Sequence, residues 1–313
     1  MNEYDFIRLN SENFSDLLDL MAVINGVAPD PMQLQRKYET QAIGAAHVGF
    51  LAYAKGEKKA AAFYGVFPVR LFLNNAEVLA AQSGDTMTHP NHRGKGLFVA
   101  LAQKTYAIAA QEGIQLVFGF PNQNSYPGFV KKLGWQHPYN MTAIDIWTPS
   151  VPFNILIKKT SSLAKYQRKW LMFLLTRFFN PVVNLPEPCS SVIGSGAFGV
   201  LRDQAYWDYK RGRNAAYQIG GATVLLKYDG DLVVGDILAP DETITSVIRR
   251  LQVVAALAGI VRIKTYCSPK SDLAQILSRK GRARESLAYG YVAFNASLQP
   301  DQLQFTYFDY DTF

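Results

Sequence analysis

The chain has 313 residues, of which 49% are hydrophobic, and a formal net charge of +7. No apolar run is long enough to cross a membrane, and the N-terminus lacks the basic and apolar segments of a signal peptide, so we expect a two-domain cytoplasmic protein. Two cysteines, Cys189 and Cys267, exclude a disulfide framework or a zinc site and are expected to act as inert hydrophobic residues.

Residues 1–148 predict one α/β unit. Tyr4 to Leu9 alternates like a strand, and a helix is expected to begin at Ser11. Three further strands are predicted, joined by connections at residues 55–59 and 74–75 that suit hairpins. These strands run over His47–Ala54, Ala61–Leu73 and Glu77–Thr88.

A glycine-rich turn follows the last of these strands. Gly94 and Gly96 allow the backbone to approach a ligand closely, and Arg93 and Lys95 add positive charge. An apolar-periodic helix is predicted from Gly96 to about Gln111. Because free N–H groups and the positive end of the helix dipole meet at this helix start, the turn predicts a cradle for pyrophosphate. It matches neither a Walker A loop nor the Rossmann glycine pattern.

A second block of interest runs from Asn122 to Trp135. It combines an Asn-containing loop, a short predicted helix and a Gly-aromatic pair. The elements predicted around it are a strand, a helix and a strand, over Leu116–Phe120, Ser125–Leu133 and Met141–Trp147.

Together the two blocks resemble the GNAT family of acyl-CoA-dependent N-acyltransferases. The family signature of Arg or Gln, two residues, Gly, one residue, then Gly or Ala maps onto Arg93, Gly96 and Phe98. Phe98 departs from the pattern, because a small residue is usual there, and it can tighten or reshape the pantetheine entrance. The resemblance implies a mixed α/β GNAT fold, whose twisted sheet splays where the cofactor enters.

Residues 149–191 predict a basic amphipathic linker helix, which Pro181 and Pro186 end. Its basic residues are Lys158, Lys159, Lys165, Arg168, Lys169 and Arg177. Its apolar stripe consists of Leu163, Tyr166, Trp170, Phe173 and Leu174. The simpler interpretation is a helix whose stripe packs on the two domains; the alternative is a weak contact of residues 155–178 with a membrane surface.

Residues 192–313 repeat the element order of the first half and resemble a second GNAT-like module. The expected elements lie at Ala216–Ile219, Thr223–Tyr228, Leu232–Leu238, a helix over 242–257, Val261–Tyr266, a helix over Lys270–Lys280, and Ala288–Phe294. Its helix start carries Asp241 and Glu242 in place of glycines, and these carboxylates would cap the helix and repel phosphate. We therefore expect one cofactor site and an acceptor side formed by the second module.

The segment Leu201–Lys210 resembles a stretch found in two-module GNAT proteins of polysaccharide biosynthesis. It makes Arg202, Tyr206 and Tyr209 candidates for binding the acceptor. The alternative is that these aromatic residues anchor the core.

The resemblance also assigns the remaining candidate site residues. Cofactor contacts are expected from Met87, Thr88, Arg93, Gly94, Lys95, Gly96, Leu97, Phe98, Asn122 and Asn124. Asp85 is the candidate general base, with a structural hydrogen-bonding role as the alternative. Val130 or Phe129 stands where the family often has tyrosine, so Tyr126, the nearest phenol, is the candidate acid, with a packing role as the alternative. No spacing of histidines predicts a metal site.

The sequence thus predicts an N-acyltransferase that moves an acetyl group from acetyl-CoA to a small amine such as an amino sugar. One alternative is an aminoacyl transferase of the peptidoglycan-bridge type, which uses charged tRNA and needs no pyrophosphate cradle. Another is a non-catalytic CoA-binding subunit. No nucleic-acid partner is expected.

Overall fold

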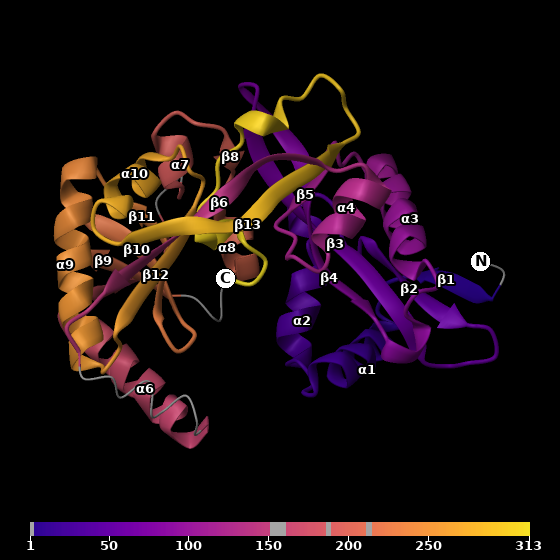
Figure 1. Cartoon of the computed structure of the whole chain (residues 1–313), viewed down its shortest axis with the longest axis horizontal. Coiled ribbons are helices and arrows are strands. Elements are labelled where there is room, and N and C mark those ends of the chain that lie inside the picture. Colours follow the sequence, from indigo (N-terminus) through magenta and orange to yellow (C-terminus); the bar gives the residue numbers. More distant parts are fainter. Residues whose placement is uncertain (1–2, 151–160, 186–188, 211–214) are drawn as a thin grey trace. The chain divides into compact units, whose positions relative to one another are not determined.

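The chain divides into two compact units (Figure 1). The computed structural model describes residues 3–150, 161–185, 189–210 and 215–313, so Lys158 and Lys159 of the predicted linker lie outside the described residues. Unit 1 contains residues 1–139 and 288–301, and unit 2 contains residues 140–287 and 302–313.

Unit 1 is built on a mixed sheet with the strand order β1-β2-β3-β4-β5-β13. Its neighbours are antiparallel except for β4 and β5, which are parallel. The strands are β1 (Tyr4–Arg8), β2 (Gly49–Ala54), β3 (Ala60–Leu73), β4 (Ala76–Thr88), β5 (Leu116–Gly119) and β13 (Arg282–Ala293). Asn74 and Asn75 turn the β3–β4 hairpin with φ of 54° and 59°, left-handed values that asparagine tolerates.

Helices cover both faces of this sheet (Figure 1). On one face, α3 (Leu97–Gln111) and α4 (Tyr126–Leu133) share a core with the alternate β3 residues Ala62, Tyr64 and Val66. On the other face, α2 (Pro31–Tyr38) places the Tyr38 ring 5.1 Å from that of Phe67. The sheet therefore separates the α3 side from the α2 side.

Two features near the N-terminus differ from the prediction. The first helix, α1 (Phe14–Asn25), starts after Asn13 and not at Ser11. Helix α2 was not predicted, although the side chain of Asp30 accepts hydrogen bonds from two backbone N–H groups and Pro31 is its first residue. Both are ordinary helix-start signals.

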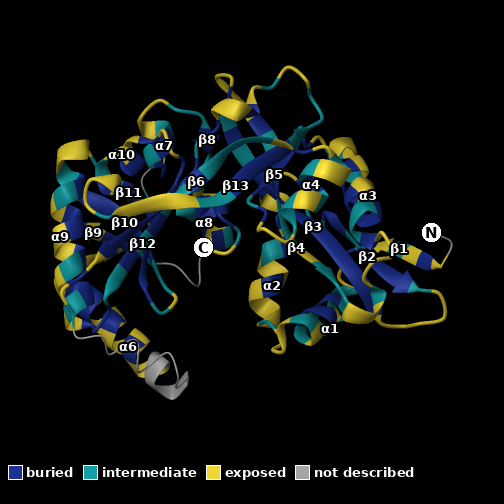
Figure 2. Ribbon diagram, in the orientation of Figure 1, coloured by how far each residue is buried: buried dark blue, intermediate teal, exposed yellow. Residues whose placement is uncertain are grey.

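Within unit 2 the strands follow the order β6-β12-β11-β10-β9-β7, again with parallel and antiparallel neighbours. The strands are β6 (Gln136–Trp147), β7 (Asn180–Val182), β9 (Ala215–Ile219), β10 (Ala222–Tyr228), β11 (Leu232–Leu238) and β12 (Arg262–Cys267), and the short β8 (Gly199–Val200) lies outside this order. The helices of unit 2 are α6 (Ser161–Phe178), α7 (Ser191–Gly194), α8 (Gln204–Lys210), α9 (Asp241–Leu257) and α10 (Asp272–Ser278). Helix α9 buries Val247, Leu251 and Val254 in the unit 2 core and exposes its outer face (Figure 2).

The two halves of the chain share one order of elements, as expected for the predicted tandem of two modules. The series β2-β3-β4-α3-β5-α4-β6 recurs as β9-β10-β11-α9-β12-α10-β13. The last strand of each series, however, pairs in the sheet of the other unit: β6 pairs with β12, and β13 pairs with β5. The compact units consequently do not follow the predicted boundaries at residues 148 and 192, because this strand exchange is a non-local pairing.

Helix α6 also differs from its simpler interpretation. The residues that enter the unit 2 core are Leu171, Leu174 and Leu175. Among the stripe residues whose side chains are described, Leu174 is buried, whereas Tyr166, Trp170 and Phe173 are exposed; the Leu163 side chain lies outside the described part. No helix in the described part of the chain is long and apolar enough to cross a membrane. Cys189 and Cys267 are free and buried, and burial raises the pKa of both thiols to about 12.

Candidate active site

The predicted cradle lies at the start of α3. Gly94 and Gly96 have φ of 78° and 77°, and a Cβ at either position would meet no atom within 4 Å. Ala100 is the first residue whose N–H bonds back into the chain here, to the carbonyl of Gly96 at 3.2 Å. Across the described residues, no acceptor takes the N–H groups from Gly94 to Val99. The helix start therefore offers unpaired donors in open space, as an anion site requires.

Charged side chains surround these donors. Arg93 and Lys95 are exposed, and the Lys95 ammonium lies 5.6 Å from the centre of the Tyr4 ring. A hydrogen bond to Tyr4 raises the pKa of Lys95, so it remains a cation. Leu97 is buried and can contribute only backbone to a ligand. His89 shapes the turn, because its Nδ1 accepts the N–H of Asn91.

Next to the cradle, β4 and β5 separate. They pair at only two positions, Ala81 with Val117 and Gln82 with Phe118. Beyond Gln82, β4 continues to Thr88 with β3 on one side and no strand of the described chain on the other. The backbone around Met87 and Thr88 thus borders an unpaired edge, which matches the predicted splay and can bond an extended ligand.

The candidate base Asp85 lies in an irregularity of this strand. Two residues of β4, Asp85 and Thr86, oppose one residue of β3, and Asp85 has a φ of 48°. This bulge turns the Asp85 carboxylate toward α2, where Lys37 Nζ donates to both oxygens at 2.9 and 3.0 Å. The hydroxyl of Tyr38 donates at 3.0 Å. Lys37 and Tyr38 were missed from the sequence because α2 was missed.

The candidate acid Tyr126 is the first residue of α4. Its hydroxyl forms a 2.8 Å hydrogen bond with Nδ1 of His137, so Asp85 and Tyr126 belong to different hydrogen-bonded groups. In the preceding loop, the side-chain oxygen of Asn122 accepts the N–H groups of Asn124 and Ser125 at 3.0 and 3.1 Å. Asn122 therefore organises the turn that leads into α4.

Phe98 does not stand free at the entrance. Its ring packs 5.1 Å from that of Phe129 and 6.0 Å from that of Tyr64. A Cβ on Gly128 of α4 would lie 2.8 Å from the Phe98 ring. The large residue in the signature is thus accommodated by a glycine on the neighbouring helix.

Buried polar groups lie beside the point where the strands separate. A hydrogen-bonded chain links Ser83, Tyr64, Tyr106 and Trp135, with distances of 2.8, 2.9 and 2.9 Å. Burial raises the pKa of both tyrosines, so they remain neutral donors. On the opposite face, Gln82 is 2% exposed and its Nε2 has no hydrogen-bond partner within the described residues. Such an unpaired donor next to a ligand site is unusual in a folded core.

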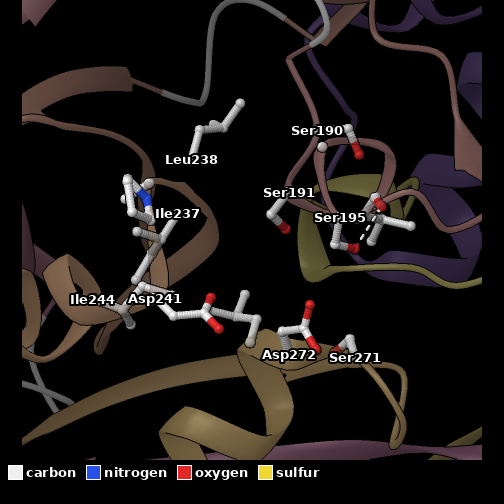
Figure 3. A pocket seen from close by; sticks show the side chains of 14 residues that line it. Ser190, Ser191, Ser195, Ile237, Leu238, Asp241, Ile244, Ser271 and Asp272 are labelled. Carbon is white, nitrogen blue, oxygen red and sulfur yellow. Dashed lines mark hydrogen bonds between the residues drawn. The ribbon is translucent and has the colours of Figure 1, made fainter.

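In unit 2, the start of α9 corresponds to the cradle at the start of α3, and it carries acidic residues. A pocket of about 510 Å³ lies at the starts of α9 and α10 (Figure 3). Asp241 and Asp272 line it together with Ser190, Ser191 and Ser195. Asp241 and Glu242 lie in the first turn of α9 as predicted, but the capping position is Pro240, and neither carboxylate caps the helix. Acidic groups here oppose pyrophosphate binding.

Arg202 and Tyr206 are placed in the interior of unit 2. All five N–H donors of Arg202 are occupied, by Asp236, Asp309, the Cys189 carbonyl and the Thr306 hydroxyl. Burial alone would lower the pKa of Arg202, but the two carboxylates raise it above its usual range. A guanidinium with no donor left cannot hold an acceptor, so the predicted acceptor-binding role does not fit this placement.

The two tyrosines of this segment accompany Arg202. Tyr206 is 2% exposed and its hydroxyl donates to the Phe308 carbonyl at 3.4 Å. Tyr209 is half-buried, with its ring 5.9 Å from that of Tyr206. Tyr206 therefore serves as a core anchor, which was the alternative interpretation, and Tyr209 remains a candidate.

The sequence and the fold of this chain were compared with those of known proteins. Residues 6–137 match the acetyltransferase (GNAT) domain family. The chain resembles GCN5-related N-acetyltransferases from Kribbella flavida (TM-score 0.57, 13% identity, covering 94% of this chain and 73% of that one) and Anabaena variabilis (0.59, 14%, 93% and 73%). A conserved protein of Enterococcus faecalis gives a TM-score of 0.61 at 12% identity, covering 93% and 73%. A search of curated proteins found no match.

The structural matches show the fold alone, because their identities are low, whereas the family match covers the cradle, the β4 edge and the Asn122 loop. Residues 6–137 are therefore similar to the acetyltransferase (GNAT) domain family, and the chain shares the fold of the solved N-acetyltransferases.

Proposed function

We propose that the protein transfers an acetyl group from acetyl-CoA to the amine of a small molecule such as an amino sugar. The observation that carries the proposal is the row of unpaired N–H groups from Gly94 to Val99, in a GNAT domain and beside the unpaired edge of β4. A pyrophosphate on the cradle, with Arg93 and Lys95 beside it, directs the pantetheine along that edge.

The chemistry then needs few further groups. The acceptor nitrogen attacks the thioester carbonyl, loses a proton to a base, and the C–S bond breaks as the thiolate takes up a proton. Backbone N–H groups near Met87 and Thr88 can stabilise the oxyanion, and orientation supplies much of the rate. Asp85 is the base in this proposal and Tyr126 is the acid.

A stoichiometry measurement tests the donor. Because the start of α9 carries carboxylates, CoA should bind once per chain in calorimetry. Gly96→Glu should weaken CoA binding by roughly two orders of magnitude, because it fills the approach and adds negative charge. Gly113→Glu is the matched control: Gly113 has a φ of +84°, equally open space, and lies at the other end of α3.

Two outcomes contradict the proposal. A stoichiometry of two would mean that unit 2 also binds CoA, and equal affinities in the Gly96 and Gly113 variants would remove the cradle from the donor site. Thermal shift with tRNA in place of CoA tests the aminoacyl-transferase alternative. Thiol release from acetyl-CoA with a panel of amines separates catalysis from CoA binding alone.

A further inference from the structure

Helix α6 carries a stripe of aromatic side chains that are exposed and do not pack in the core. Its inner face is committed to unit 2, where Gln167 donates to the carbonyls of Ala258 and Gly259 at 3.0 and 3.3 Å. Beside that face, Tyr166, Trp170 and Phe173 are 69%, 48% and 55% exposed. Residues spaced by four and three lie along one line of a helix, so these three form a continuous stripe.

The stripe continues onto α9. The indole N–H of Trp170 donates to the Leu257 carbonyl at 3.1 Å, and the Trp170 and Phe173 rings stack with centres 5.4 Å apart. Leu257 is 53% exposed, and Val253, one turn earlier on α9, is 57% exposed. We call these five residues, Tyr166, Trp170, Phe173, Val253 and Leu257, the aromatic patch. A contiguous apolar patch across two helices is typical of an interaction surface.

Positive charge surrounds the aromatic patch. The sequence of α6 contains no acidic residue. Exposed cations stand on both helices: Lys165, Arg168, Lys169 and Arg177 on α6, and Arg249 and Arg250 on α9. Within the described parts of the chain, none of the four α6 cations forms an ion pair. These four cations are therefore available to an anionic partner.

We propose that the aromatic patch docks on the surface of an anionic phospholipid bilayer. Tyrosine and tryptophan suit the boundary between headgroups and acyl chains, and lysine and arginine beside them reach anionic headgroups. A second copy of this chain fits less well, because a symmetric contact would bring the same cations together.

Vesicle co-sedimentation of the full chain tests the proposal. The protein should bind phosphatidylcholine vesicles containing about one quarter phosphatidylglycerol roughly tenfold more tightly than pure phosphatidylcholine vesicles, and should be released between about 0.1 and about 0.5 M salt. Lys165→Glu/Lys169→Glu, which leaves the packed face unchanged, should abolish binding. Arg279→Glu/Lys280→Glu makes the same charge change at exposed positions after α10 and should retain most of it.

The apolar part is tested separately. Phe173→Ser should weaken vesicle binding several-fold. Val23→Ser alters a residue of similar exposure, 57%, on α1 and should not. All variants should keep the thermal unfolding transition of the parent, which reports an intact fold.

Three outcomes overturn the proposal. The first is an absence of binding to anionic vesicles. The second is equal loss in the two charge-reversal variants. The third is sedimentation of a dimer that Phe173→Ser dissociates while no vesicle binding is seen, which would assign the patch to a second copy.

Discussion

Asp85 can act as the general base or as a structural anion, and an experiment can distinguish these two roles. Its carboxylate accepts hydrogen bonds from Lys37 and Tyr38, and its side chain is 14% exposed. A base needs a lone pair that can reach the incoming amine, whereas a structural anion needs only its partners. Mutation of each partner can separate the two roles. A base is lost only when the Asp85 carboxylate is removed, whereas a structural ion pair is lost when either Asp85 or Lys37 is removed.

Removing each partner in turn distinguishes the roles. If Asp85 is the base, Asp85→Asn should lower kcat by about 100-fold at unchanged CoA affinity, whereas Lys37→Met should alter kcat only a few-fold. Steady-state kinetics at saturating acetyl-CoA, with urea denaturation for stability, provide the measurement. Equal losses of kcat and of stability in the two variants would show that the ion pair is structural and that the base lies elsewhere.

The contact of α3 with α4 depends on the absence of a side chain. Gly128 lies inside α4, where alanine would ordinarily stabilise the helix by up to about 1 kcal/mol. Here the added Cβ meets the Phe98 ring, which Phe129 and Tyr64 hold from other sides. We expect Gly128→Ala to lower the free energy of unfolding by about 1–3 kcal/mol, as overpacking does.

A double-mutant cycle checks that this cost comes from Phe98. In a Phe98→Leu background, Gly128→Ala should be neutral or stabilising, because the smaller side chain leaves room for the methyl group. Urea unfolding of the four proteins gives the coupling energy. If Gly128→Ala costs the same in both backgrounds, the glycine is required for another reason.

Local sequence signals predicted some elements correctly, whereas other elements were missed. The cradle could be predicted because positive φ at Gly94 and Gly96 and the helix after them are properties of a short segment. Helix α2 was missed although Asp30 and Pro31 mark its start, and with it Lys37, the partner of Asp85. The resemblance of residues 201–210 made Arg202 a candidate for acceptor binding, and its carboxylate partners, 34 and 107 residues away, cannot be identified from spacing.

The exchange of strands between the units is the feature least accessible to sequence reasoning. The two exchanged strands themselves were predicted correctly, since the predicted strands at 141–147 and 288–294 overlap β6 and β13. Alternation specifies that a segment is a strand but not which sheet it joins. Each unit is thereby completed by the last strand of the other series, with Gly290 opposite Gly119 in unit 1 and Thr265 opposite Ile144 in unit 2.

This exchange predicts how the chain can be divided. A fragment of residues 1–148 lacks β13, so β5 keeps an unpaired edge and the end of β6 loses its partner β12. We expect this fragment to show no cooperative thermal transition and no CoA binding. Joining residues 1–139 directly to 288–301 by a short flexible linker restores unit 1, since the Tyr139 and Tyr289 rings are only 5.0 Å apart.

The joined fragment should unfold cooperatively and bind CoA in calorimetry, because the cradle and the β4 edge lie wholly within unit 1. Turnover of the amine is the property that it should lack if unit 2 forms the acceptor side. Cooperative unfolding and CoA binding by residues 1–148 alone would contradict the prediction. That result would mean that β13 adds to a module already stable without it, and that the exchange serves to connect the modules and not to complete them.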